Sequence, residues 1–376
     1  MLRASGSSRK GVFAGLDYTL LAVVSVLSLA GALMVYSTSS VYALETHGDS
    51  WRFFKLQMIY LAIGFIVMFV VAMTDYTMLK RLAMPAYFAG LVLLCAVLFE
   101  GVGREVFGAR RWLQVGGFAF QPSEFAKFIF FLYMAESLSR KSELMKNFMR
   151  GVVPYLLLGG IYVGLIFVEP DFGTAFIILC VTGIMLFLGG ARIAHLCALA
   201  GGAMCFTVFA VWIEPYRKTR LLSFLDPWGN YFDSGYQAVQ SMMAFSLGGL
   251  FGQGLGASNQ KLFFLPQAHT DFILSIIGEE LGFAGVFAVV AAFAVFLFRS
   301  VRIAVMAPDA FGFHLVMSYS LLIVFQAALN MAVALSMMPT KGLTLPFLSY
   351  GGTSLVVSLG AVGVILSVSR AGSRKK

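Results

Sequence analysis

Charged residues are scarce in this sequence. Asp, Glu, Lys and Arg make up 12% of the 376 residues, whereas hydrophobic residues make up 59% and the mean hydropathy is +0.86. Soluble globular domains carry about 25% charged residues, so this composition excludes a soluble protein of this length. It is typical of a protein that crosses a membrane several times.

Cysteine and histidine are also rare, with four residues of each. All four cysteines lie inside apolar runs without CxxC spacing, so we expect core packing rather than disulfides or bound metal. The histidines are scattered, which argues against a metal centre built from histidine. The sequence also lacks an internal repeat of the kind that marks many transporters.

Hydrophobic runs of membrane-spanning length recur along the chain, since a helix needs roughly 20 residues to cross a bilayer. They predict an all-α integral membrane protein with ten transmembrane helices, built as a single polytopic domain over residues 1–376. The first run is too long for a removable signal peptide. The predicted spans are 16–36, 54–73, 82–99, 123–138, 152–168, 172–190, 193–213, 271–298, 311–337 and 350–369.

The basic residues predict the orientation of these spans. Most of the 27 Lys and Arg residues fall at the two termini and in the loops that share their side of the membrane. By the positive-inside rule, both termini are therefore cytoplasmic. The net charge of +9 reflects this topology and implies no nucleic-acid partner.

One predicted loop, residues 214–270, is far longer than the others and is extracytoplasmic, between spans seven and eight. Its middle, SGYQAVQSMMAFSLGGL, predicts a helix whose apolar face lies on the membrane surface. The glycine-dense stretch GLFGQGLGASNQK follows. It either offers backbone N–H groups to a phosphate or serves as a flexible hinge.

Three carboxylates, Asp271, Glu279 and Glu280, stand where this loop enters span eight. A charge near hydrocarbon is costly, so such acids indicate a site; the alternative is acids held at the membrane surface or paired with lysines. At roughly 100° per residue, Glu279 lies about 80° and Glu280 about 180° from Asp271 around a helix. We therefore expect Glu279 to face the same cavity as Asp271, and Glu280 to pair with a neighbouring helix.

A second polar segment, residues 108–128, leads into span four, and Pro122 suits the first turn of that helix. Glu124 and Lys127 are one turn apart and share a face. Either they satisfy each other, or Lys127 faces the acids of span eight and sets their charge state.

Three residues just before this helix and one after span nine are further candidates for binding. Arg110 and Arg111 are placed to grip an anionic head group. Trp112 is either an interfacial anchor or a platform for stacking sugars. In PTKGLTLPFLSYGGTS, where prolines and glycines break the helical pattern, Lys341 either reaches a substrate phosphate or extends to the membrane interface.

Together these motifs resemble the SEDS family (shape, elongation, division and sporulation). HTDFILSIIGEELGF, ARRW with QPSEFAKF, EPDFGT and PTKGLTLPFLSYGGTS occur in the order that the family shows, over nearly the whole chain. The ten-span topology with a large loop before span eight is also similar. PTKG and DPWGNYFDSGYQ resemble the division-type members more than the elongation type, and the sporulation type is similar too.

The resemblance implies a peptidoglycan glycosyltransferase that polymerises lipid II at the outer face of the cytoplasmic (inner) membrane, at the division septum. Transfer would invert the sugar, with undecaprenyl pyrophosphate leaving. Asp271 matches the family's key aspartate and suits a general base. Around it we predict substrate-binding roles for the polar residues already described and for two neighbours of Asp271: Arg110, Arg111, Trp112, Glu124, Lys127, His269, Thr270, Glu279 and Lys341.

The resemblance also implies partners and a cofactor. The partners are a class B penicillin-binding protein, which is a transpeptidase, other divisome proteins and membrane lipids. The cofactor is a divalent cation, Mg or Mn, with unidentified ligands, and no organic cofactor is expected.

Two positions depart from the family pattern. The family usually has glutamate at Gln267 and often an acid at Phe263, so Asp271 is the only carboxylate left beside His269. This favours Asp271 as base over a scheme with two carboxylates. Other functions stay open: an elongation or sporulation polymerase, a lipid II flippase, or a non-catalytic divisome scaffold. The missing repeat and the outer clustering of charge argue against a carrier.

Overall fold

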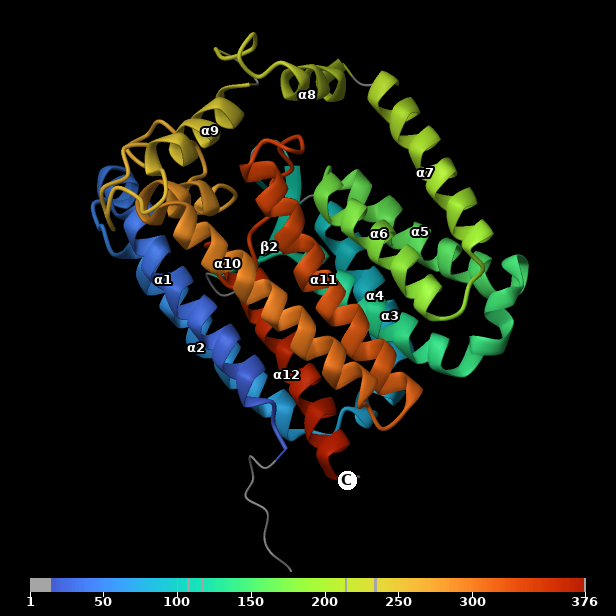
Figure 1. Cartoon of the computed structure of the whole chain (residues 1–376). Helices are drawn as coiled ribbons and strands as arrows, with labels where there is room; N and C mark the ends of the chain where they lie inside the picture. Colours follow the sequence, from blue (N-terminus) through green and yellow to red (C-terminus); the bar gives the residue numbers. More distant parts are fainter. Residues whose placement is uncertain are drawn as a thin grey trace, which may run out of the picture.

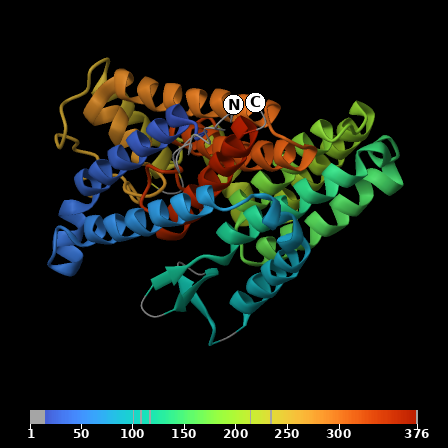
Figure 2. The same cartoon turned by 90° about the horizontal axis from the view of Figure 1, so that it is seen from below.

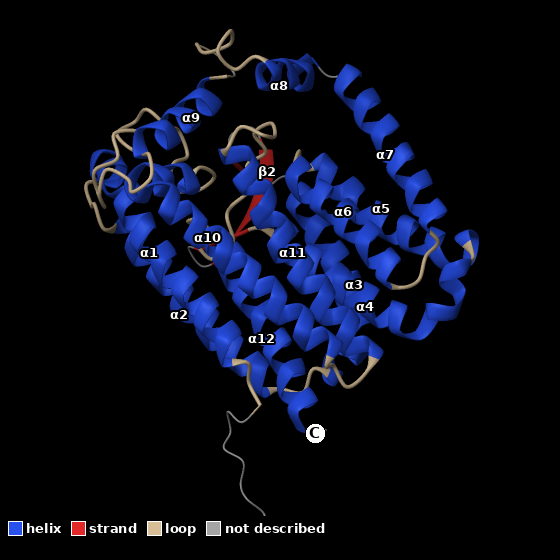
Figure 3. Ribbon diagram, viewed as in Figure 1, coloured by secondary structure: helices blue, strands red, loops and turns tan. Residues whose placement is uncertain are grey.

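Helices make up most of the molecule (Figures 1 and 3). The computed structural model describes residues 15–99, 101–106, 109–115, 118–213, 215–232 and 235–374. Its α-helices are α1 (Tyr18–His47), α2 (Arg52–Met73), α3 (Thr77–Leu98), α4 (Pro122–Lys141), α5 (Val153–Val168), α6 (Phe172–Leu188), α7 (Ile193–Ile213), α8 (Pro215–Leu225), α9 (Tyr236–Gly248), α10 (Ile273–Val305), α11 (Ala310–Ala334) and α12 (Gly352–Arg374). A 3-10 helix, η1 (Ser142–Lys146), and a π-helix, η2 (Phe148–Val152), join α4 to α5.

Within the residues that the structure describes, seven helical stretches are long and apolar enough to cross a membrane: Tyr18–His47, Arg52–Met73, Thr77–Leu98, Phe148–Val168, Ile273–Val305, Ala310–Ala334 and Gly352–Ser373. Two more apolar helices, Phe172–Leu188 and Ile193–Gly202, are shorter, and α4 is interrupted by charged residues. Each predicted span overlaps a helix, although α1 continues to His47 and α10 to Val305, well beyond the predicted ends at 36 and 298. The protein is thus a mostly helical, multi-pass membrane protein, while the number of crossings stays a prediction.

The prediction of an all-α fold missed a small antiparallel sheet between α3 and α4. Its strands are β1 (Gly103–Val106), β2 (Ala109–Val115) and β3 (Phe118–Phe120), in that spatial order. In the register, Leu113 of β2 pairs with Gly103 on one side and Phe120 on the other. The sheet projects from the bundle (Figure 2). β1 and β3 have only four and three residues, and β2, ARRWLQV, does not alternate strictly between apolar and polar residues, so a search for long apolar runs passes over the sheet.

The long connection between α7 and α10 contains two helices. The unpredicted α8 leads from α7 across one end of the molecule towards α9 (Figure 1). The predicted surface helix is α9, but its buried face packs on protein: the hydroxyl oxygens of Ser241 and Ser275 are 2.6 Å apart. Gly248 also packs directly on the backbone of Gly278. The apolar face of α9 is therefore at least partly a contact with α10.

Helix α10 is broken at Gly282, where φ is 69°. The backbone of Leu250 to Gly252 lies where a side chain at Gly282 would be, so only glycine fits. The same loop supplies hydrogen bonds that the broken helix lacks, since the N–H of Gln253 donates to the Glu279 carbonyl at 3.0 Å and that of Phe283 to Gly249 at 2.9 Å. The first turns of α10 are thus held by the preceding loop.

Aspartates fix the starts of three helices. Asp17, Asp171 and Asp309 each accept a backbone N–H from the first turn of α1, α6 and α11, at 2.9, 3.1 and 2.8 Å. Asp17 is also paired with Arg299 of α10. These caps set the ends of helices that apolar content alone leaves undefined.

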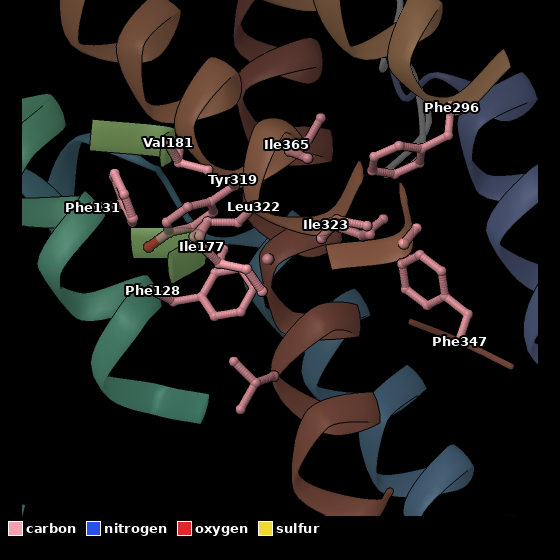
Figure 4. Close-up of a cluster of buried hydrophobic side chains, with 14 of the residues drawn as sticks. Phe128, Phe131, Ile177, Val181, Phe296, Tyr319, Leu322, Ile323, Phe347 and Ile365 are labelled. Carbon is pink, nitrogen blue, oxygen red and sulfur yellow. The ribbon is translucent and has the colours of Figure 1, made fainter. Parts of the chain in front are cut away.

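The core lies where α4, α6, α11 and α12 meet (Figure 4). Figure 4 shows residues from these helices gathered with Phe296 of α10 and Phe347 of the loop before α12: Phe128, Phe131, Ile177, Val181, Tyr319, Leu322, Ile323 and Ile365. Close backbone packing supports this core, because a side chain at Gly363 of α12 would lie 2.5 Å from the Met68 carbonyl oxygen of α2.

All four cysteines are free, as expected, but the prediction that they pack in the core is mostly wrong. Cys95, Cys197 and Cys205 are exposed on the outside of the bundle, and Cys180 is half-buried. In a membrane an apolar side chain can face lipid as readily as protein. Apolar surroundings in the sequence therefore do not separate core positions from lipid-facing ones.

Candidate active site

Asp271 lies in a tight turn just before α10 begins at Ile273. The carbonyl of Gln267 accepts the N–H groups of Thr270, Asp271 and Phe272 at 3.1, 3.1 and 3.3 Å. Gln267 has a φ of 59°, an uncommon value for a residue other than glycine. Gln267 thus organises the turn that presents Asp271.

The carboxylate of Asp271 lines a cavity of about 130 Å³. The other lining residues come from α9, the turn before α10, α11 and the loop before α12: Gln237, Phe272, Asn330, Val333, Thr340, Lys341, Gly342 and Leu343. A side-chain carbon at Gly342 would lie 3.7 Å from Oδ2 of Asp271, and the φ of Gly342 is 64°. Glycine therefore keeps the space in front of the carboxylate open.

Asn330 of α11 joins the two loops that form the cavity. Its amide nitrogen donates to the carbonyls of Asp271 at 2.8 Å and Leu343 at 2.6 Å. Its amide oxygen is buried and has no hydrogen-bond partner within the described part of the chain. Since a buried acceptor without a partner is costly, this oxygen is suited to accept a hydrogen bond from a substrate.

The cavity wall carries one cation, Lys341. Its ammonium group lies 3.9 Å from the centre of the Phe176 ring, a cation–π contact. Burial lowers the pKa of Lys341 from its ordinary value. Lys341 thus lines the same cavity as Asp271. Its two predicted roles, reaching a substrate phosphate and extending to the membrane interface, both stay predictions.

Arg111 of β2 reaches the turn between α5 and α6. It donates to the carbonyls of Glu169 at 2.8 Å and Pro170 at 2.7 Å. Pro170 has a φ of 29°, far from the usual proline value. Asp171, which caps α6, accepts hydrogen bonds from Gln121 and Ser123 at 3.3 and 3.2 Å. The EPDFGT motif and the sheet are therefore held together at one place.

Arg111 and Asp171 also act on the charge of Asp271. Burial raises its pKa to about 7, the Thr270 hydroxyl and Arg111 act to lower it, and Asp171 acts to raise it. At neutral pH this carboxyl is divided between its protonated and ionised forms, as general acid–base catalysis requires.

Glu169 is a second acid with a raised pKa. Burial and the charge of Asp171 raise it to about 8, against the lowering effect of Arg111. Glu169 is 1% exposed, and within the described residues neither carboxyl oxygen has a hydrogen-bond partner. Its side chain is therefore mainly neutral at pH 7.

Glu124 and Lys127 form the predicted pair, with 2.7 Å between carboxylate oxygen and ammonium nitrogen, and both are buried. Lys127 also donates to Gln326 of α11 at 2.6 Å, and Gln326 donates to the Thr344 carbonyl at 3.0 Å. The hydrogen bonds of Lys127 thus run to α11, rather than to the acids of α10 as the alternative reading expected. The pair supports the loop before α12.

His269 and Thr270 sit in packed surroundings. The His269 ring lies 5.0 Å from that of Phe53 and 5.7 Å from that of Tyr42. Burial lowers the pKa of His269 to about 4, so it is neutral at pH 7. Its carbonyl accepts the N–H of Tyr350 at 2.9 Å. These contacts fix the turn of Asp271; a role in binding substrate stays a prediction for both residues.

The predicted orientation of Glu279 is wrong. Its carboxylate accepts hydrogen bonds from the Ser258 hydroxyl and from the backbone N–H groups of Asn259 at 2.9 Å and Gln260 at 3.3 Å. The helical-wheel argument failed because Asp271 lies outside α10, so no constant rotation relates the two acids.

Glu280 pairs with a neighbouring helix, as predicted. Its carboxylate accepts a hydrogen bond from the Ser37 hydroxyl of α1 at 2.7 Å. It also forms an ion pair with the Lys261 ammonium group at 2.7 Å. Both Glu279 and Glu280 are fully buried.

The two arginines and the tryptophan of the second segment all lie on β2. Arg110 pairs in register with Glu105 of β1, and Trp112 with Arg104. Trp112 and Arg110 are both half-buried. Arg111 also acts electrostatically on Asp271.

Sequence reasoning missed Gln267, Asn330, Asp171 and Glu169 as parts of this site. A signal existed for Asn330 and Gln326, because two amides one turn apart in an apolar span are uncommon and point inward. The two acids of EPDFGT had been used only for the family resemblance. The turn at Gln267 requires a left-handed backbone conformation at that residue, and glutamine in a sequence does not predict such a conformation.

The chain is similar to known proteins over nearly its whole length. The family model of the cell cycle proteins FtsW, RodA and SpoVE matches residues 17–374. A probable peptidoglycan glycosyltransferase FtsW of Geobacter sp. (strain M18) is 43% identical, over 94% of this chain and 97% of its own. The stage V sporulation protein E of Bacillus subtilis (strain 168) is 42% identical over 94% and 97%. A chain from a study of how a peptidoglycan synthase complex coordinates polymerisation and crosslinking has a TM-score of 0.78 at 29% identity, covering 95% of this chain and 98% of that one.

Proposed function

This chain belongs to the FtsW, RodA and SpoVE family and is a peptidoglycan glycosyltransferase, and we propose that it polymerises lipid II with Asp271 as the general base. One observation carries the assignment of the base. Asp271 lines a cavity and its pKa is raised to about 7, whereas the carboxylates of Glu279 and Glu280 are fully buried and bonded to groups of the chain itself.

The proposed reaction joins two lipid-linked sugars. The Asp271 carboxylate takes the proton of the acceptor hydroxyl as its oxygen attacks the anomeric carbon of the donor. The bond from that carbon to the pyrophosphate oxygen breaks, and the lipid pyrophosphate leaves with the electron pair. A single displacement of this kind inverts the anomeric centre. A base placed in this way typically contributes about 10²–10⁴-fold in rate.

Two cations can stabilise the charge that develops on the leaving pyrophosphate. Arg111 acts on the charge of Asp271, and Lys341 lines the same cavity. Positive charge held in a site that excludes water stabilises such a transition state strongly. We propose that these two residues, with Arg110, bind the pyrophosphate.

The cavity is small for this substrate. Its volume of about 130 Å³ is below the roughly 300–1,000 Å³ of most ligand sites. We propose that the cavity binds only the reacting hydroxyl group and the edge of the sugar ring that carries it. The lipid chains would then lie along the outside of the bundle.

A divalent cation stays a proposal. The described residues contain no cluster of three or more His, Cys, Asp or Glu side chains that could hold a metal ion. Magnesium is commonly held by one or two carboxylates together with substrate phosphates, so Mg or Mn would depend on the pyrophosphate for part of its ligands. Each step described above uses side chains of the chain itself.

The finer features of location and assembly are proposed as well. We propose ten crossings with both termini cytoplasmic, which places Asp271 at the outer face of the inner membrane. We also propose that the protein acts at the division septum, together with a class B penicillin-binding protein and other divisome proteins. The apolar bundle and the basic residues at one end support this topology.

The test is glycan polymerisation from purified lipid II by the full-length chain, with and without a class B partner, and with Mg or Mn present. Formation of glycan strands supports the proposal. Movement of labelled lipid II across vesicle membranes without polymer would favour a flippase. Stimulation of a partner's polymerase by a chain that makes no polymer itself would favour a scaffold.

A further inference from the structure

A cavity at the far end of α4 and α6 plays no part in the proposed reaction. Both helices begin beside the candidate active site, since Ser123 of α4 and Asp171 of α6 share a hydrogen bond. Their other ends lead into η1 and η2 and into α7, and there a cavity of about 470 Å³ opens. A helix of 20 residues is about 30 Å long, so this cavity is remote from Asp271.

The lining of this cavity is strongly basic. Four groups that carry or can carry positive charge, Lys146, Arg150, Arg192 and His195, surround it, and Glu143 is the one acid in the wall that the structure describes. Within the described residues, Lys146, Arg150 and Arg192 form no ion pair with the chain's own carboxylates. Unpaired cations that converge on a concave site attract an anion.

Polar groups inside the cavity also lack partners. The ring of His195 is partly buried, lies 5.2 Å from that of Phe148, and its Nδ1 is buried without a hydrogen-bond partner in the described chain. Asn147 accepts the N–H of Arg150 at 3.1 Å through its side-chain oxygen, which leaves its amide N–H groups to donate. The site therefore offers hydrogen bonds as well as charge.

Apolar side chains accompany the basic groups. Leu144 of η1 and Met149 of η2 line the cavity and are 42% and 69% exposed. Ile193, which follows Arg192 at the start of α7, is 66% exposed. Met149 lies at the start of the candidate membrane span Phe148–Val168. Basic pockets between membrane helices on the cytoplasmic side commonly bind anionic head groups. A free phosphate would make no use of this apolar rim, whereas a phospholipid would place its acyl chains against it.

We propose that this cavity binds the phosphate diester head group of an anionic phospholipid, with Lys146, Arg150 and Arg192 on the phosphate and Met149 and Ile193 against the acyl chains. The proposal does not depend on the reaction at Asp271. It predicts a lipid that remains bound at the junction of α4, α5 and α7 when the protein is extracted.

The test compares lipid retention in two variants of equal charge. The full-length chain is reconstituted with phosphatidylglycerol and phosphatidylcholine, extracted in detergent, and examined by native mass spectrometry. The variant Arg150→Gln with Arg192→Gln removes two cations from the cavity. The control, Arg81→Gln with Arg302→Gln, removes two exposed cations elsewhere. Since a cation near an anionic surface contributes about 1 kcal/mol, or about fivefold, the first variant should hold phosphatidylglycerol about 30-fold more weakly.

The expected result is loss of bound phosphatidylglycerol in the cavity variant alone, with phosphatidylcholine unaffected in both. Equal loss in the two variants would show only general attraction and would overturn the proposal. Competition by inorganic phosphate as strong as that by phosphatidylglycerol would overturn the lipid assignment. If the double variant fails to fold, Lys146→Gln alone gives the same comparison with an expected loss of about fivefold.

Discussion

Asp271 and the pair Glu279 and Glu280 lie in one short stretch of sequence, yet the structure surrounds them very differently. Glu279 accepts three hydrogen bonds. Glu280 accepts a hydrogen bond from the Ser37 hydroxyl and forms an ion pair with Lys261. Asp271 forms no ion pair among the described residues and faces a cavity opposite a glycine. Acids whose partners all belong to the chain hold the fold, whereas an acid that keeps an open side is available for chemistry.

The break at Gly282 explains why the two kinds of acid are so close. The loop that packs against this break also supplies the partners of Glu279 and Glu280. The acids therefore clamp the loop to the first turns of α10, and the loop continues directly into the turn of Asp271. On this view Glu279 and Glu280 position the base without contacting substrate.

Replacing the base tests one side of this comparison and has the largest expected effect. Asp271→Asn should lower the polymerisation rate by about 10²–10⁴-fold, because the amide cannot take the acceptor proton. Its melting temperature should not fall, since no ion pair is lost. Rate from purified lipid II and thermal unfolding are measured on the same preparation. A variant that polymerises at the wild-type rate would remove Asp271 as base.

Breaking the Lys261 pair tests the other side. Glu280→Gln leaves the Lys261 ammonium group buried without its counter-charge, and loss of one member of a buried pair costs roughly 3–5 kcal/mol. We expect a lower melting temperature and a lower yield, with activity per folded molecule changed only a few-fold. The matched control is the double variant Glu280→Gln with Lys261→Gln, which should recover part of the loss. An unchanged melting temperature in the single variant would contradict the clamp.

The pH dependence of the rate sharpens the comparison without a mutation. With a pKa of about 7, Asp271 is ionised in about one tenth of molecules at pH 6 and about nine tenths at pH 8. A base acts in its ionised form, so the polymerisation rate should rise about tenfold over this interval. A rate that is flat or falls with pH from 6 to 8 would count against the assignment.

Glu169 provides the smallest expected effect on activity. Its carboxyl is mainly protonated at pH 7, so Glu169→Gln, which is also neutral, should change the rate by less than about twofold. Stability should respond more clearly. The folded state keeps a proton up to about pH 8 that the unfolded chain releases near 4.5, so wild-type stability falls as pH rises between these values. In the variant this fall should be shallower; a loss of activity at pH 7 would show that Glu169 takes part in the reaction.

The sequence predicts those features of the fold and of the site that depend on a single local property, such as hydropathy or the spacing of two residues. Apolar runs located the membrane helices because length and hydropathy suffice for that. Pro122 marked the start of α4, and the spacing of Glu124 and Lys127 gave their pair. Asp271 was identified as the central acid from its motif, and the prolines and glycines around Lys341 indicated a break in the helical pattern.

The rest depends on contacts between distant parts of the chain. Whether Glu279 faces Asp271 is decided by where α10 begins and by the turn of Gln267, which local periodicity cannot give. The strand that carries Arg111, ARRWLQV, lacks the strict alternation that would mark it as a strand. Asn330 gains its role only because two loops, far apart in sequence, meet at its amide.

The most direct test of the account compares the polymerisation rates of Asp271→Asn, Glu279→Gln and Glu280→Gln, each corrected for the folded fraction. The account predicts that Asp271→Asn loses at least about 10²-fold in rate, while the two glutamate variants lose stability and keep most of their rate per folded molecule. Equal loss of rate in all three folded variants, or a fully active Asp271→Asn, would contradict it.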